Sequence, residues 1–207
     1  MERHSEPLVD LRNANPDLLS ARDKILRTAI ILFNEHGVHT TGIDKIIAES
    51  EIAKMTFYKH FPSKNDLINA YLNYRDKVQF ERLERHTIKK TNDPRLQVLG
   101  IFDALDEWFS EADYKGCAFT RGLADFGDHP ESEAFKSVQR HFAKWLEFVS
   151  VPLKEIMPPK KIKVVLPQLM SLIIGSIVLE NASPHSGIAK VNKKLAAEVI
   201  DKYVLRA

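Results

Sequence analysis

The sequence predicts an all-α protein, and three observations support this fold class. Apolar residues recur every three or four positions along most of the chain, which is the spacing of one helix face. No run of useful length alternates between apolar and polar residues, as a half-buried β-strand would. Three segments combine a serine or threonine with an aspartate three positions later, the signature of a helix N-terminus. These segments begin at Ser20, Thr41 and Ser63.

The composition is that of a soluble globular protein. The 207 residues are 44% hydrophobic and 28% charged, enough to bury a core. The single cysteine excludes an internal disulfide bond and fits a reducing compartment. The sequence contains neither a signal-peptide pattern nor about 18 consecutive apolar residues, so we expect a cytoplasmic protein without a membrane segment. The net charge of +2 is too small to indicate a partner.

Residues 1–19 are predicted to form a flexible N-terminal arm, because they show no periodicity and contain an Asn-Pro pair. Arg3 and Arg12 could reach a DNA minor groove from such an arm, although a solvated tail is the favoured interpretation. The first helix is predicted between Ser20, which would cap it, and Gly37, which would end it.

Two short helices are predicted close together, over residues 43–50 and 54–60. The gap of about three residues between them is that of a helix-turn-helix. Ile52, Phe57 and Phe61 fall on one side of the second helix, where they would hold it against its neighbours. A helix of this size fits the DNA major groove, which is about 12 Å wide. The opposite side carries cations, a phenol and a flexible apolar side chain, namely Lys54, Met55, Tyr58 and Lys59.

The local charge around this second helix also favours DNA. Residues 52–65 include three lysines and one histidine but no acidic residue. We therefore expect the affinity to come largely from phosphate contacts and to depend strongly on salt. The mixed charges of residues 81–90 are interpreted instead as a solvated helix face.

The segments GIDKIIAES and EIAKMTFYKHFPSKNDLI resemble the DNA-binding half of the TetR/AcrR family of repressors, over roughly residues 20–70. The resemblance includes the threonine before the second helix, the tyrosine in the third, Phe61, and the Ser-Lys pair that opens the fourth. It implies a three-helix DNA-binding domain over residues 20–66, whose third helix enters the major groove. The implied groove positions are Lys54, Met55, Thr56, Tyr58, Lys59 and His60, and the implied phosphate contacts are Thr41 and Lys64.

Three positions depart from the family pattern. Glu51 stands in the turn where the family usually has glycine, Ala53 replaces a serine cap, and Met55 replaces another glycine. A turn with positive φ would strain Glu51, and a missing capping oxygen costs about 1 kcal/mol. Met55 either contacts a thymine methyl group or fills space. These changes bear on DNA sequence preference more than on the fold.

Residues 67–207 are expected to form a helical effector-binding and dimerisation domain, as the resemblance implies. A long helix over about residues 63–89 would link it to the DNA-binding domain and could transmit a tilt. Further helical stripes follow over residues 96–109, 117–126 and 135–149.

The last two helices, over about residues 161–182 and 188–205, are predicted to form a homodimer interface. The segment VVLPQLMSLIIGSIVLE is apolar on more than one face, and Gly175 with Ser176 would allow close approach of a partner. Pro167 should either kink the first of these helices or mark a late start. A dimer of this kind would place two reading helices about one turn of DNA apart, on a palindromic operator.

Aromatic residues crowd the middle of the chain, where they are more often core than ligand site. The resemblance nevertheless implies a mainly apolar effector site in the C-terminal helices. Arg121 either meets an anionic ligand or pairs with Asp125, and the ion pair is favoured. Cys117 is either a thiol sensor of oxidants or electrophiles or a buried free cysteine. The candidate ligand residues are Phe102, Leu105, Trp108, Phe109, Cys117, Phe119, Arg121, Phe142 and Trp145.

The sequence therefore favours a ligand-responsive transcriptional regulator, which family habit implies to be a repressor released by a small, mainly apolar effector. One alternative is a partner-binding protein of the same fold with weakened DNA affinity. An enzyme is a third class, yet the sequence shows no Ser-His-Asp spacing, phosphate-binding glycine loop or metal cluster. His129, near Asp128 and Glu131, is the nearest approach to a catalytic group, and His36 and His39 straddle a helix end. We expect no catalysis, metal or cofactor.

Overall fold

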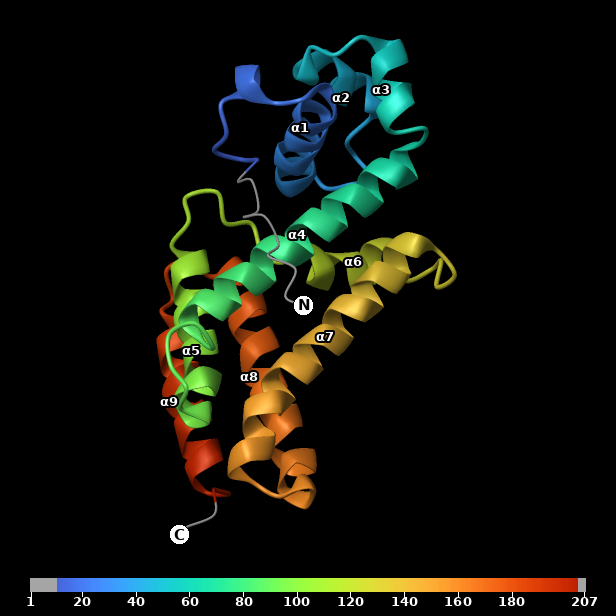
Figure 1. Cartoon of the computed structure of the whole chain (residues 1–207). Coiled ribbons are helices and arrows are strands. Elements are labelled where there is room, and N and C mark those ends of the chain that lie inside the picture. Colours follow the sequence, from blue (N-terminus) through green and yellow to red (C-terminus); the bar gives the residue numbers. More distant parts are fainter. Residues whose placement is uncertain (1–10, 205–207) are drawn as a thin grey trace, which may run out of the picture. The chain divides into compact units, whose positions relative to one another are not determined.

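The computed structural model describes residues 11–204, and every regular element within this range is a helix (Figure 1). This confirms the predicted all-α class. In chain order the helices are η1 (Pro16–Leu18), α1 (Ala21–His36), α2 (Ile43–Ser50), α3 (Lys54–His60), α4 (Lys64–His86), α5 (Pro94–Phe109), α6 (Ala118–Phe126), α7 (Glu133–Ile156), α8 (Pro159–Ala182) and α9 (Ile188–Asp201).

The described residues form two compact units. Unit 1 comprises residues 11–78 and Ala118–Val138, and unit 2 comprises Gln79–Cys117 and residues 139–204. Helices α4 and α7 each begin in unit 1 and continue into unit 2. The domain boundary expected after residue 66 thus lies inside unit 1, which also includes α6.

Two of the three predicted helix starts are confirmed by their hydrogen bonds. The Ser20 hydroxyl accepts from the Asp23 amide at 3.1 Å, and the Asp66 amide likewise donates to the Ser63 hydroxyl at 3.2 Å. The third start is wrong in detail, because Gly42 precedes α2 and no side chain caps this helix. The hydroxyl of Thr41 donates instead to the carbonyl of Gly37 at 2.8 Å, so it has turned away from α2.

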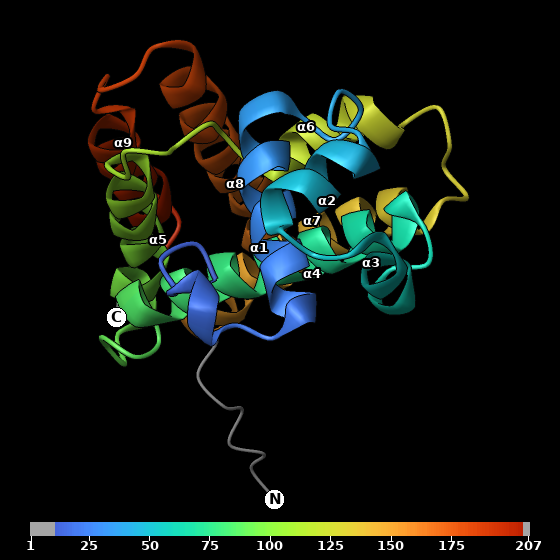
Figure 2. The same ribbon diagram turned by 90° about the horizontal axis from the view of Figure 1, so that it is seen from above.

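The core of unit 1 is built around α1, which packs against both α2 and α3. Figure 2 shows these three helices grouped together. The buried side chains at their centre are large and apolar. Their packing stabilises α2 and α3, which are too short to be stable alone. These side chains are Ile25, Ile30 and Phe33 of α1, Ile46 of α2, Phe57 of α3, and Phe61, Leu67 and Tyr71 after it.

Part of the predicted N-terminal arm contacts this core. Leu11 is buried, and its amide donates to the Tyr74 hydroxyl at 3.0 Å. The carbonyl of Arg12 accepts from the Arg27 guanidinium at 3.3 Å. Arg3, the other candidate for a minor-groove contact, lies outside the described residues.

In unit 2, α5, α8 and α9 pack against one another and lie side by side in Figures 1 and 2. The end of α4 lies very close to α5 at Gly100. A Cβ atom built there would be 2.1 Å from the carbonyl oxygen of His86, so this approach requires glycine. Pro152 and Pro167 lie inside α7 and α8. Pro167 therefore does not mark a late start, and α7 continues past Pro152 to Ile156.

Among the described residues, α8 is the one helix long and apolar enough to cross a membrane by length and composition. About a third of its most apolar window is buried inside the chain. A helix that packs against protein on several faces has the same composition. The contacts of α8 with α5 and α9 favour packing against protein as the explanation of its apolar composition.

Candidate nucleic-acid interface

Helix α3 is held by aromatic residues on its inner side. Phe57 is completely buried, and its ring centroid lies 6.3 Å from that of the buried Phe61. The Arg22 guanidinium covers the Phe61 ring at 5.1 Å from the ring centroid. These contacts can stabilise a seven-residue helix that would not form alone.

The outer side of α3 is open to solvent. Met55 is 85% exposed and Tyr58 is 40% exposed. The Tyr58 ring packs edge-on against Phe57, which holds the phenol at the surface. Lys54 and Lys59 are also exposed, and Thr56 and His60 are half-buried. The predicted division of α3 into an anchored face and a projecting face is confirmed.

One acidic residue of α2 lies near this face. The Lys54 ammonium is 3.5 Å from the Asp44 carboxylate, and both side chains are largely exposed. An exposed pair of this kind contributes little and can exchange for a phosphate contact. The pair therefore does not remove Lys54 from the set of cations available to DNA.

The turn between α2 and α3 shows both features expected from the departures at Glu51 and Ala53, a strained backbone and a missing helix cap. Glu51 has φ 56° and ψ 29°, a left-handed conformation that costs a non-glycine residue about 1–2 kcal/mol. Ala53 precedes α3 without a side-chain hydrogen bond to the helix. Both predictions about these residues are confirmed, and α3 is positioned by packing rather than by its cap.

The two implied phosphate contacts differ in their surroundings. Thr41 is 1% exposed and its hydroxyl is bonded to Gly37, so this side chain is poorly placed to reach a phosphate. Lys64 lies half-buried in the first turn of α4. Its ammonium donates to the carbonyl of His39 at 3.4 Å, and burial lowers the pKa of Lys64.

The predicted ligand residues are divided between the two units. Phe119 and Arg121 belong to unit 1, whereas the other seven belong to unit 2. Most of them are closely packed core residues. The buried members are Phe102, Leu105, Trp108, Phe109, Cys117, Phe119 and Trp145, and Phe142 is half-buried.

Arg121 differs from its favoured ion pair, whereas Cys117 matches one of its two predicted alternatives, a buried free cysteine. The Arg121 guanidinium donates to the Asn34 carbonyl at 3.4 Å rather than to the carboxylate of Asp125. The cavity beside it has a volume of about 10 Å³, too small for a drug-sized effector. Cys117 is 7% exposed, so access of an oxidant to its thiol is restricted.

A larger cavity lies within unit 2, between the turn after α4, helix α5 and helix α7. Its volume is about 260 Å³. None of the nine predicted ligand residues lines it, because its wall comes from three segments far apart in sequence. The lining residues are Thr87, Ile88, Gln97, Ile101, Lys144, Glu147, Phe148, Val151 and Pro152.

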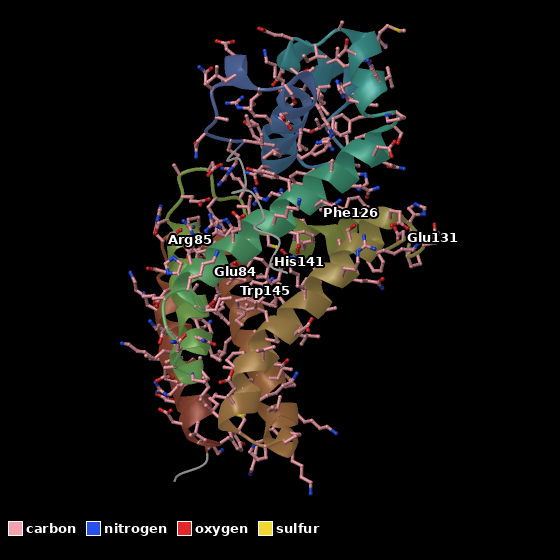
Figure 3. All side chains as sticks on the ribbon, viewed as in Figure 1. Glu84, Arg85, Phe126, Glu131, His141 and Trp145 are labelled. Carbon is pink, nitrogen blue, oxygen red and sulfur yellow. The ribbon has the colours of Figure 1, made fainter. Side chains whose placement is uncertain are left out.

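Aromatic side chains form a cluster beside this cavity. The Phe80 ring centroid lies 5.7 Å from that of Phe148 and 5.9 Å from that of Trp145. Figure 3 labels Trp145 and His141 on α7, and the Trp145 indole donates to His141 at 3.0 Å. The Lys144 ammonium lies 3.9 Å from the Phe80 ring centroid. Trp145 thus supports the wall of the cavity without lining it.

Charged residues near the end of α4 bond to α5. His86 Nε2 lies 2.6 Å from one Glu107 carboxylate oxygen, and Arg85 donates to the other at 2.9 Å. Partial burial raises the pKa of Glu107, but its hydrogen bond with His86 and the nearby arginines lower the pKa by more. The pKa of Glu107 therefore lies below its usual value. Arg82 is buried and pairs with Glu111. The interpretation of residues 81–90 as a solvated face is therefore wrong for this part of the segment.

Comparison with known proteins finds a tetR-family segment in the N-terminal part of the chain. Residues 25–71 match the model of bacterial regulatory proteins of the tetR family. The uncharacterized HTH-type transcriptional regulator YxaF of Bacillus subtilis is 36% identical over 75 residues, which cover 36% of this chain and 39% of that protein. The HTH-type transcriptional regulator QacR of Staphylococcus aureus is 29% identical over 92 residues, which cover 44% of this chain and 49% of that protein. The chain thus matches less than two thirds of either relative's length.

The fold extends the similarity beyond this segment. The crystal structure of SCO4454, a TetR-family transcriptional regulator from Streptomyces coelicolor, superimposes with a TM-score of 0.82 at 23% identity. The match covers 88% of this chain and 95% of that one. These similar proteins are named as transcriptional regulators, in agreement with the function class expected from the sequence. The family model and the two relatives agree on a tetR-family segment in the N-terminal part of the chain, and the fold of the chain resembles that of a TetR-family transcriptional regulator.

Proposed function

We propose that the protein is a cytoplasmic transcriptional regulator that binds a palindromic operator as a homodimer, with α3 of each copy in the major groove. The observation that carries this proposal is the division of α3. Its buried Phe57 anchors the helix, while Lys54, Tyr58 and Lys59 project into solvent. Cations beside a phenol on a narrow helix suit contacts with both phosphates and base edges.

The second copy would cover the exposed apolar face of α8 and α9. A Cβ atom built at Gly175 has no neighbour within 4 Å, which leaves room for close approach of a partner. Ser176 is not part of this face, because its hydroxyl accepts from Asn192 within the chain at 2.8 Å. The exposed apolar side chains of the two helices are Val164, Val178, Leu179, Val191 and Leu195.

The cavity of unit 2 is the proposed effector site. Its size suits a small, mainly apolar molecule, and Gln97, Lys144 and Glu147 offer polar groups for one end of it. Thr87 and Ile88 directly follow α4, so a ligand here would act on the unit 2 end of a helix that begins in unit 1. Release from DNA would require tighter ligand binding in the conformation that does not fit the operator.

The strained turn and the uncapped α3 favour one alternative, a partner-binding protein of this fold with weakened DNA affinity. In vitro selection from a random duplex library with the purified protein separates the two functions. We expect enrichment of an inverted repeat whose half-sites lie about one helical turn, or 10 base pairs, apart. No enrichment at low salt would contradict the proposed DNA-binding function and favour the alternative.

A further inference from the structure

Helix α6 belongs to the same compact unit as α1 to α3, and its last turn contacts the turn between α1 and α2. The His39 ring donates from Nε2 to the carbonyl oxygen of Asp125 at 2.9 Å. The centroid of the same ring lies 6.0 Å from that of Phe126 at the end of α6, and Figure 3 labels Phe126. Because the two segments are 86 residues apart, no sequence pattern indicates this contact.

The contact of α6 with the rest of unit 1 does not depend on His39 alone. The Arg121 guanidinium of α6 donates to the carbonyl of Asn34 near the end of α1. Apolar side chains meet around the small cavity between these elements and leave it only about 10 Å³ of space. The position of α6 is therefore coupled to the end of α1 and to the turn that follows. The apolar residues concerned are Phe33, Val38, Tyr71, Leu72, Ala118 and Phe126.

The backbone of His39 makes a second contact, with Lys64. The carbonyl of His39 accepts from the Lys64 ammonium at 3.4 Å. Lys64 follows α3 closely in sequence and belongs to the cationic, acid-free segment of residues 52–65. His39 thus contacts α6 through its ring and a lysine beside the proposed DNA-binding face through its carbonyl.

We propose that His39 is a positioning residue for DNA binding. Its ring fixes the turn between α1 and α2 to the end of α6, and its carbonyl then directs the Lys64 ammonium toward a DNA phosphate. A displacement of α6 would in this way weaken a phosphate contact without any change in α3. This inference rests on the proposed DNA-binding function.

The test uses the full-length protein and the duplex that the wild-type protein selects from the random library. His39→Ala removes the ring and should lower both the affinity and the slope of log K against log salt. Loss of one phosphate contact lowers this slope by about 1, so a dimer should lose about 2. Lys64→Ala should have the same effect, and the double variant should be no worse than either single one.

Conservative substitutions separate positioning from general stability. His39→Gln places an amide N–H near the position of Nε2 and should restore the slope, whereas the shorter His39→Asn should not. His36→Ala is the matched control, because His36 is an exposed histidine whose ring lies 3.7 Å from Glu35 in the same helix. It should leave the slope unchanged.

Three results with the variants would overturn the inference. A normal salt slope for His39→Ala would mean that Lys64 does not depend on this side chain. Additive losses in the double variant would mean that the two residues act separately, and failure of His39→Gln to restore the slope would exclude the hydrogen bond. If the wild-type protein enriches no duplex, the proposed function fails and the inference fails with it. Normal wild-type binding with unaffected His39 variants contradicts the inference alone.

Discussion

The surface of α3 and the surface of α8 and α9 are both exposed, but they differ in chemistry. On α3, the projecting side chains include two lysines and a tyrosine around Met55. On α8 and α9, valines and leucines predominate, and Gly175 leaves room for a partner backbone. A polyanion suits the first surface and a second apolar helix pair suits the second. The proposed DNA contact would therefore be sensitive to salt, whereas the proposed dimer contact would depend on apolar burial.

The largest effect is expected when charge is introduced into the apolar surface. Leu179→Glu should weaken the dimer by about 3 kcal/mol, roughly a hundredfold, because the carboxylate would be buried without a partner. Sedimentation equilibrium would report the dissociation constant, and binding to the selected duplex should weaken in parallel. Leu96→Glu, at a similarly exposed leucine of α5, is the matched control. Equal effects of the two variants would place the dimer interface elsewhere.

An intermediate effect is expected at the start of α3. Ala53→Ser supplies the side-chain oxygen that the helix lacks and should raise the free energy of unfolding by about 1 kcal/mol. Ala53→Val has no such oxygen and should not stabilise the protein. Thermal or denaturant unfolding of the two variants would measure the difference. Equal free energies of unfolding would show that a side-chain cap adds no stability to α3 beyond that from the packing of Phe57.

The smallest effect is expected at Glu107 of α5. Its pKa in the folded protein lies below the usual 4.5, so its contribution to stability is present above this pH and is lost as the pH falls through the folded value. Glu107→Gln should cost less than about 1 kcal/mol at neutral pH, because the carboxylate is partly exposed. Unfolding curves at several pH values should show the difference shrinking below pH 4.5. A difference independent of pH would contradict this assignment.

The predictions from sequence succeeded where structure depends on neighbouring residues. The faces of α3 follow from the positions of Phe57 and Tyr58 in one helical turn, and Ser20 and Ser63 cap helices through residues three positions away. Thr41 had the same local pattern, but its hydroxyl found a competing acceptor in the carbonyl of Gly37. Local patterns therefore indicate a helix start without deciding which partner a hydroxyl takes.

Contacts between segments far apart in the chain could not be predicted from the sequence. Aromatic residues such as Phe102 and Trp145 have the same spacing in a packed core as in a ligand site, and here both are buried in the core. The cavity of unit 2 instead joins residues 87–88 with parts of α5 and α7. The hydrogen bond between His39 and Asp125 likewise depends on how α6 packs, which no periodicity reveals.

The most direct test of the account is whether the outer face of α3 contacts DNA. Binding of the selected duplex by Tyr58→Ala and Lys59→Ala should be measured by titration, with the dimer checked by sedimentation. We predict a loss of about 1–3 kcal/mol for each variant with the dimer intact. Unchanged affinity for the duplex in both variants would contradict the account.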